Sequence, residues 1–194
     1  MKYRVLLIGF WFMSFQVSSQ SELILSGKDS QMIIRGTSSL HPWQCRAEQV
    51  SGQLKAELIN GGVKNINSLV FIAGSSFIKS IKDNGEYYDK NMDKNVYKAL
   101  DVTKYPNITF TFSRLVSVKP TALEVVGILK IAGSTKEISI TAKAIPSAAG
   151  IIFEGKVPIK MTDYNIEPPT ALFGTIKTGN EVSVEYKLVF MATK

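Results

Sequence analysis

Cysteine and histidine each occur once in the 194 residues, as Cys45 and His41, and this scarcity limits the available chemistry. A single cysteine cannot form an internal disulfide, so Cys45 is interpreted as a small buried apolar residue. A hydrolase with a catalytic triad would need His41 as its base. The two residues lie four apart, but Pro42 argues against a helix between them, and two ligands are fewer than zinc requires. The sequence therefore predicts no metal site, no cofactor and no catalytic residues.

Signatures of catalysis by other means, and of nucleic-acid binding, are also missing. There is no phosphate-binding glycine loop and no paired-carboxylate motif, and most carboxylates fall on the polar faces of expected strands. The formal net charge is +7, but the basic residues are scattered, and their densest patch, Lys79–Lys98, is interleaved with acidic residues. A nucleic-acid-binding protein concentrates its positive charge on one face. The pattern favours a non-catalytic protein without a nucleic-acid partner.

The apolar run at the N-terminus, Val5–Phe15, is too short to cross a bilayer, because a spanning helix needs ~20 apolar residues. Lys2 and Arg4 precede the run, and small residues ending at Ser19 follow it. This order is typical of a secretory signal peptide, here predicted to cover residues 1–19. Its removal takes away two basic residues and lowers the net charge from +7 to +5. We expect one domain, residues 20–194, in the periplasm or outside the cell.

Alternation of apolar and polar residues dominates the rest of the chain and indicates strands with one buried face. The clearest segments are Val50–Leu58, Leu123–Ile131, Ile138–Ala142, Phe153–Met161 and Val182–Phe190. Short turn sequences separate them, such as Asn60-Gly61-Gly62, whose residues tolerate positive φ. About eight strands of this kind predict an antiparallel sandwich or barrel. A barrel of ~8 strands has no exposed edges and can hold one small ligand.

The segment from Met92 to Phe112 differs from its surroundings, because its apolar residues change period from four to two. Its first half predicts a short amphipathic helix with Asn91 as cap, and Tyr105-Pro106-Asn107 is expected to stop this helix. From Ile108 the segment predicts a strand with one buried face. One amphipathic helix in a chain of strands indicates a mobile lid on the barrel.

The inward faces of the strands and the helix together form an apolar, aromatic-rich stripe. In most proteins such a stripe is only core, but Gly52, Gly127 and Gly155 on inward faces are expected to leave room for a cavity. A hollow apolar barrel would be a lipid pocket. The residues assigned to this pocket are Tyr97, Leu100, Tyr105, Phe110, Phe112, Leu123, Val125, Leu129, Phe153, Val157, Val184, Tyr186 and Leu188.

Three segments resemble the YceI-like polyisoprenoid-binding proteins. Asp101–Phe110 (DVTKYPNITF) is similar to the helix-to-strand segment of that family, and Gly127–Lys136 (GILKIAGSTK) to its hairpin. Val50-Ser51-Gly52 and the upstream His41 fit its early strands. The resemblance covers nearly all of residues 20–194. It implies an extended, lipocalin-like, antiparallel barrel, and together with the strand count and the helix it predicts an eight-stranded barrel with one short lid helix. It also implies export, an interior that binds long isoprenoid or other lipid chains, and no established catalytic residues.

The leading hypothesis is an exported carrier or scavenger of a hydrophobic small molecule, an isoprenoid or fatty-acyl lipid, that contacts membranes transiently. A second hypothesis is an enzyme, a hydrolase or isomerase, that uses the barrel pocket as its active site. The scarcity of histidine counts against it. A third is a filled barrel that serves as a structural or interaction module.

Overall fold

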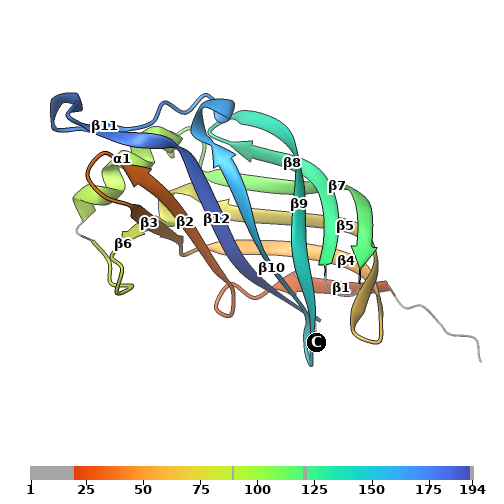
Figure 1. Ribbon diagram of the computed structural model, residues 1–194. Helices are drawn as coiled ribbons and strands as arrows, with labels where there is room; N and C mark the ends of the chain where they lie inside the picture. Colours follow the sequence, from red (N-terminus) through yellow and green to blue (C-terminus); the bar gives the residue numbers. More distant parts are fainter. Residues whose placement is uncertain (1–19, 89, 120–121, 193–194) are drawn as a thin grey trace, which may run out of the picture.

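The computed structural model describes residues 20–88, 90–119 and 122–192, and this part of the chain consists mainly of strands (Figure 1). The expected signal peptide lies outside the described residues, as do residues 89, 120–121 and 193–194. Within them, no helix has the length and apolarity needed to span a membrane. The strands are β1 (Gln20–Leu25), β2 (Gln31–Ser38), β3 (Trp43–Ala47), β4 (Val50–Ile59), β5 (Gly62–Gly74), β6 (Ile78–Ile81), β7 (Asn107–Lys119), β8 (Ala122–Ile131), β9 (Ser134–Ser147), β10 (Gly150–Lys160), β11 (Thr170–Ala171) and β12 (Ile176–Ala192). The α-helix is α1 (Lys90–Leu100), and short 3-10 turns occur at Ser75–Phe77, Met161–Tyr164 and Leu172–Gly174.

Eight strands close into an antiparallel barrel in the order β1, β4, β5, β7, β8, β9, β10, β12. The ring closes where β1 pairs with the end of β12, through Leu23 with Ala192, Ile24 with Met191 and Leu25 with Phe190. Closure pairs the strand edges that an open sheet would leave exposed. The eight-stranded barrel expected from the alternation is therefore confirmed.

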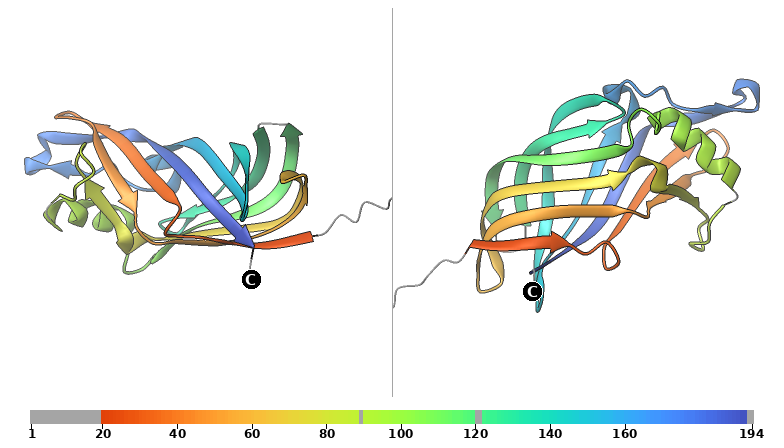
Figure 2. Two further views of the ribbon diagram at one scale, coloured as in Figure 1. Left: turned by 90° about the horizontal axis from the view of Figure 1, so that it is seen from below. Right: turned by 180° about the vertical axis from the view of Figure 1, so that it is seen from behind.

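Three further strands extend the sheet beyond the ring. On the side of β12 that faces away from β10, residues 182–187 pair with β2, and residues 190–192 pair with β1. β2 continues to β3, and β3 to β6. Figures 1 and 2 show that β2, β3, β6 and α1 gather at one end of the barrel, so the barrel wall is extended at that end only. The sheet formed there by β2, β3 and β6 next to β12 is here called the extended wall.

Inward and outward residues follow the predicted alternation in most strands. In β4, Leu54 and Ala56 are fully buried, while Gln53 and Lys55 are exposed. The β4–β5 turn has positive φ at Asn60 (51°) and Gly61 (77°), the geometry of a tight two-residue hairpin. The β8–β9 turn uses Ala132 (45°) and Gly133 (80°) in the same way.

The expectation that three inward glycines leave a hollow is wrong. A Cβ atom at Gly127 would overlap the ring of Phe110, and one at Gly155 would overlap the ring of Tyr186. At Gly52 it would lie 2.7 Å from the carbonyl oxygen of Val70. Aromatic side chains of neighbouring strands lie over the first two glycines, as is common where a glycine lacks a side chain to pack. These glycines make room for protein atoms, and the cavity has another origin.

Helix α1 begins at Lys90, so Asn91 lies in its first turn rather than at the cap. The helix ends at Leu100, before the expected stop at Tyr105-Pro106, because Asp101 adopts a left-handed conformation with φ 45°. The amide of Val102 then bonds the carbonyl of Tyr97 at 3.2 Å, which satisfies one of the free carbonyl groups at the helix end. β7 follows at Asn107, as the change of period predicts.

Candidate functional site

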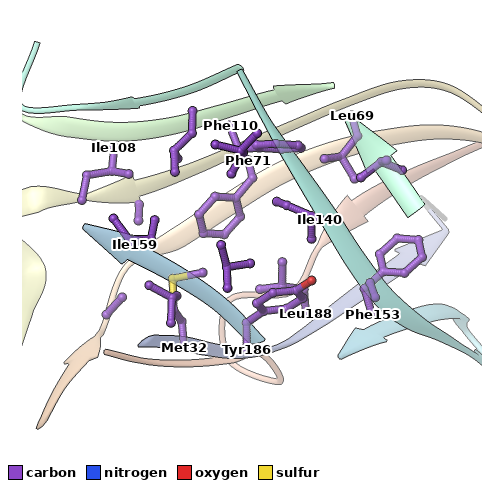
Figure 3. A pocket seen from close by; sticks show the side chains of 18 of the residues that line it. Met32, Leu69, Phe71, Ile108, Phe110, Ile140, Phe153, Ile159, Tyr186 and Leu188 are labelled. Carbon is purple, nitrogen blue, oxygen red and sulfur yellow. The ribbon is translucent and has the colours of Figure 1, made fainter. Parts of the chain in front are cut away.

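The barrel encloses a cavity of about 170 Å³, here called the inner chamber. Its wall is made of side chains from every barrel strand except β1 and β4, together with residues of β2, β3 and β6 (Figure 3). Nearly all of these side chains are aliphatic or aromatic. The hydroxyl group of Tyr186 is the exception, and burial raises the pKa of Tyr186 to about 12. A chamber of this composition stabilises hydrocarbon and disfavours water.

A second cavity of about 340 Å³, here called the vestibule, lies beneath α1. Met92, Asn95, Val96, Ala99 and Leu100 of the helix form one side of it. The other sides come from β2, β3 and β6, from the bend at residues 38–41, and from the segment at residues 166–178. Six residues line both cavities, which therefore adjoin at a waist of branched side chains: Ile34, Ile78, Ile108, Ile131, Ile159 and Val184.

The structure places eleven of the thirteen predicted pocket residues on the cavity walls. Leu100 lines the vestibule, and Val184 lies at the waist. The other nine line the inner chamber: Phe110, Phe112, Leu123, Val125, Leu129, Phe153, Val157, Tyr186 and Leu188. The strand alternation located these residues because a two-residue period fixes which face a side chain occupies.

Tyr97 and Tyr105 line neither cavity. Tyr97 shares its helix face with Asp93, four residues earlier, and this face is turned to β6, where Lys79 donates a hydrogen bond to the Tyr97 hydroxyl. The ring of Tyr105 lies against Gly133 in the β8–β9 turn, with the ammonium group of Lys104 5.2 Å from its centre. The structure thus places neither side chain on a cavity wall, and a role of these two residues in ligand binding stays a prediction. The apolar spacing of the helix did not show which of its two buried faces meets the cavity.

Several lining residues were missed by the sequence reasoning. Met32 and Ile34 line the inner chamber, but the continuous run Met32-Ile33-Ile34 has no alternation that would assign a face. Leu69 and Phe71 also line it, but they belong to the continuous apolar run Leu69–Ala73, which has no alternation either. The vestibule residues come from short, separate segments, which no single periodic pattern connects.

A buried carboxylate attaches α1 to the extended wall. Asp93 is 6% exposed, and its Oδ1 accepts a hydrogen bond of 2.7 Å from the backbone amide of Ser80 in β6. Its Oδ2 lies 3.5 Å from Nζ of Lys79. The hydrogen bond to Tyr97 is the main cause that raises the pKa of Lys79, and Asp93 adds to it. The helix is thus fixed at one side and covers the vestibule with the other.

Cys45 and His41, the residues with the most reactive side chains, both line the vestibule. Burial raises the pKa of Cys45 to about 11, which keeps the thiol protonated at neutral pH. His41 lies on the exposed bend after β2, with Nδ1 2.6 Å from the carbonyl oxygen of Pro42. Among the described residues, no three His, Cys, Asp or Glu side chains gather in an arrangement that could hold a metal ion.

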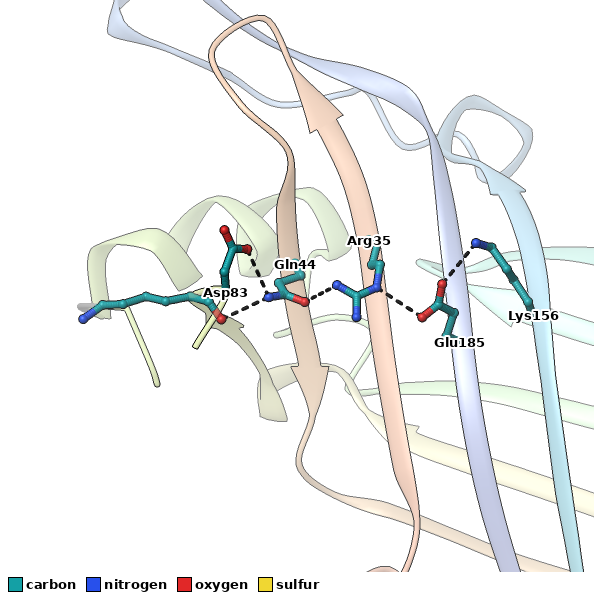
Figure 4. A network of polar contacts seen from close by, with 6 residues as sticks. Arg35, Gln44, Asp83, Lys156 and Glu185 are labelled. Carbon is teal, nitrogen blue, oxygen red and sulfur yellow. Dashed lines mark hydrogen bonds and ion pairs between the residues drawn. The ribbon is translucent and has the colours of Figure 1, made fainter. Parts of the chain in front are cut away.

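A row of polar contacts crosses the outer surface of the extended wall (Figure 4). Glu185 of β12 accepts hydrogen bonds from Lys156 of β10 at 3.0 Å and from Arg35 of β2 at 3.1 Å, and these bonds lower its pKa. Arg35 also donates to Gln44 of β3, which in turn donates to the carbonyl oxygen of Lys82 at 3.0 Å. These exposed contacts contribute little individually but connect β10, β12, β2, β3 and the end of β6 in register.

The fold and the cavities define a hollow antiparallel barrel with an apolar chamber and an opening beneath a helix. A family model of the YceI-like domain matches residues 33–190, and the chain belongs to this family. A search of curated protein sequences found no match.

Three solved structures share the fold at low sequence identity. BcnA of Burkholderia cenocepacia is 18% identical, with a TM-score of 0.68 over 84% of this chain and 98% of that chain. A polyisoprenoid binding domain from Saccharophagus degradans, implicated in plant cell wall breakdown, is 14% identical, with a TM-score of 0.67 over 90% and 100%. A YCEI protein of Campylobacter jejuni is 16% identical, with a TM-score of 0.60 over 100% and 99%.

Proposed function

We propose that the protein is an exported, non-catalytic carrier or scavenger that binds a long-chain isoprenoid or another lipid in the barrel interior, which comprises the inner chamber and the vestibule. The observation that carries this proposal is the apolar inner chamber of about 170 Å³, which adjoins the vestibule of about 340 Å³. The name of the Saccharophagus degradans domain, a polyisoprenoid binding domain of the same fold, supports the choice of ligand class.

The tail alone supplies enough free energy for tight binding. Each methylene group buried from water contributes ~0.8 kcal/mol, so a tail of about 15 carbons contributes roughly 12 kcal/mol. Loss of translational freedom and ordering of the chain offset several kcal/mol of this. Affinity should therefore rise with chain length until the chamber is full, and then level off.

Mass spectrometry of organic extracts from the freshly purified protein tests the proposal. We expect a long-chain isoprenoid or fatty-acyl lipid in stoichiometric amounts, released only when the protein unfolds. A series of alcohols of increasing chain length, titrated into delipidated protein, should show the rise and the levelling of affinity. Empty extracts together with no uptake of any chain would refute the proposal.

The absence of catalysis is part of the same proposal, and the state of Cys45 supports it. A nucleophilic cysteine needs a lowered pKa, whereas burial raises the pKa of Cys45 to about 11. An enzyme of the hydrolase or isomerase class would rely on His41, the only imidazole in the chain. Turnover of an ester or isoprenoid substrate by the wild type, lost in His41→Ala, would favour the enzyme instead.

We also propose that the carrier exchanges its ligand at a bilayer through the vestibule opening. Leu40, Met92 and Phe173 are exposed apolar side chains from three separate segments, and Leu40 and Met92 line the vestibule themselves. Phe173 is fully exposed, and its loop lies beside the Leu40 bend, because the Ser39 amide bonds the Lys177 carbonyl at 2.9 Å. Inserted into a membrane surface, these side chains would bring the opening to the lipid and shield the tail from water.

A further inference from the structure

The polar side chains that the structure describes on the vestibule wall share one property, which is that none of them carries a permanent charge. They present hydroxyl, carboxamide, thiol, indole and imidazole groups, and of the described residues that line the cavity, none carries an ammonium, guanidinium or carboxylate group. This contrasts with the outer surface of the same strands, where Arg35, Glu185 and Lys156 form the row of ion pairs. Apart from the pair of Asp93 and Lys79 between α1 and β6, the ion pairs described above thus lie on the outer surface, and none of their side chains lines the cavity.

Some of these neutral groups already have structural partners. The Gln44 amide bonds the chain after β6, and the Ser38 hydroxyl donates to the carbonyl oxygen of His41 at 2.8 Å and so holds the bend. Other polar groups that line the cavity have no strong protein partner. Among described residues, the solvent-exposed Asn95 carboxamide and Tyr88 hydroxyl make no hydrogen bond with the protein, and the buried Ser80 hydroxyl has only the weak 3.8 Å contact with the Cys45 sulfur.

The Ser80 hydroxyl group is the most confined of these. Ser80 is 5% exposed and lies close to the waist, because it follows the waist residue Ile78 by two positions on the same face of β6. The buried carboxylate of Asp93 accepts the amide hydrogen of Ser80 from behind. An anion brought to this position would lose its hydration without gaining a cation on the cavity wall, because the nearby ammonium group of Lys79 is already paired with Asp93 at 3.5 Å.

From this arrangement we infer that the ligand carries an uncharged head group that can hydrogen-bond, such as an alcohol, a carbonyl or an amide. The head group lies in the vestibule, where Ser80 and Asn95 contact it, while the tail crosses the waist into the inner chamber. This inference rests on the proposed function and narrows it to neutral lipids. A lipid diphosphate or a fatty acid anion of the same chain length is bound less tightly.

Matched lipids that differ only in the head group test the inference. Geranylgeraniol and geranylgeranyl diphosphate form one pair, and hexadecanamide and hexadecanoate the other. Trp43 lines the vestibule, and the second tryptophan, Trp11, lies in the predicted signal peptide, so tryptophan emission of the exported protein reports filling of the vestibule. Each lipid is titrated below its micelle concentration at pH 8, with calorimetry as a second readout.

We expect the neutral member of each pair to bind at least tenfold more tightly than its charged partner. A charged member that binds as tightly as the neutral one, or more tightly, would overturn the inference and leave lipid binding itself standing. If no member of either pair binds, the proposed function fails instead. The two failures are therefore distinct.

Single substitutions test the assigned contacts. Ser80→Ala and Asn95→Ala should each weaken geranylgeraniol binding about threefold to tenfold, the usual effect of one lost hydrogen bond. Neither should change the affinity for a plain hydrocarbon of equal length, which makes no such bond. Ser139→Ala is the matched control, because that hydroxyl donates to Glu124 at 2.8 Å on the outside of the barrel. Unchanged alcohol affinity in both vestibule variants would overturn the assignment of these residues to the head group.

Discussion

Filling the inner chamber with a larger side chain should separate ligand binding from folding, and Val125 is the position for this test. Val125 lines the inner chamber, six residues along β8 from Ile131 at the waist. At ~3.3 Å per residue and a strand tilt of about 40°, it lies roughly 15 Å beyond the waist. Val125→Trp therefore places an indole ring in the deep half of the chamber.

The expected loss of affinity follows from the atoms that the ring displaces. Tryptophan has about seven more side-chain heavy atoms than valine, and each displaced methylene group of the tail forfeits ~0.8 kcal/mol. The upper limit of the lost binding free energy is on the order of 5 kcal/mol. Because part of the tail can shift into the vestibule, we expect the affinity to fall by at least tenfold to a hundredfold. In a filled core, the same substitution would instead cost ~1–3 kcal/mol of stability. Because the chamber holds about 170 Å³ of free space, we expect a smaller cost.

The assay compares uptake of a fluorescent long-chain lipid and the thermal midpoint in wild type, Val125→Trp and Val116→Trp. Val116 lies on β7 and is half exposed on the outside of the barrel, so it controls for the added tryptophan. We also expect lipids too short to reach Val125 to bind the variant normally. A variant that is strongly destabilised, or that binds long chains as well as the wild type does, would refute the hollow-chamber reasoning.

Four further perturbations test other parts of the molecule. Asp93→Ala leaves the Ser80 amide of β6 without its partner and should lower the free energy of unfolding by roughly 1–3 kcal/mol, seen as a fall of several degrees in the thermal midpoint. Asp163→Ala, at an exposed position, should change the midpoint little, and equal midpoints of the two variants would contradict the attachment of α1 through Asp93. In the folded state the pKa of Cys45 is about 11, against an ordinary 9.0, so the protonated thiol contributes its full share of stability below pH 9 and loses it as the pH rises from 9 to 11. The free energy of unfolding of the wild type should therefore fall by on the order of 2–3 kcal/mol over this range, but that of Cys45→Ala should not, and parallel pH profiles would refute this. Phe173→Ser should weaken binding to phospholipid vesicles about tenfold. It should not lower stability, because the ring of Phe173 is fully exposed and its backbone has the left-handed φ of 53°, and vesicle binding equal to that of a Val116→Ser control would exclude Phe173 from the membrane contact. Amide exchange in α1 should slow when lipid is added, and equal protection with and without lipid would argue against a mobile lid.

The strands and their faces could be predicted from the sequence because a two-residue period leaves only two choices for each side chain. Val184 and Tyr186 illustrate this, since each lies between two polar residues in the sequence and each lines the inner chamber. The helix was harder, because Tyr97 and Leu100 belong to two buried faces of one short helix. Which face meets the cavity depends on Lys79 and Ser80 of β6, and these contacts are formed only in the folded chain.

The origin of the hollow was also beyond the sequence. Glycine at positions 127 and 155 indicated empty space, but Phe110 and Tyr186 of neighbouring strands occupy it. Whether the space over a glycine is empty depends on the side chains of the neighbouring strands, and the sequence of one strand does not show which of these side chains lie over it. The vestibule was missed for a related reason. Its wall joins Trp43, Ser80 and Asn95, which come from three elements that only the extended sheet brings together.

The seam between β1 and β12 has a consequence for the order in which the molecule assembles. Its three residue pairs join positions between 165 and 169 residues apart, whereas β4–β5 and β7–β8 are local hairpins. Contacts between distant positions carry a large loop-closure entropy and form late. Until the seam forms, β1 and the end of β12 are unpaired edges able to pair with another copy of the chain. A lipid that packs against the chamber strands before the seam closes would bring β1 and the end of β12 together and accelerate this slow step. Ligand binding would then shorten the time during which aggregation competes with folding.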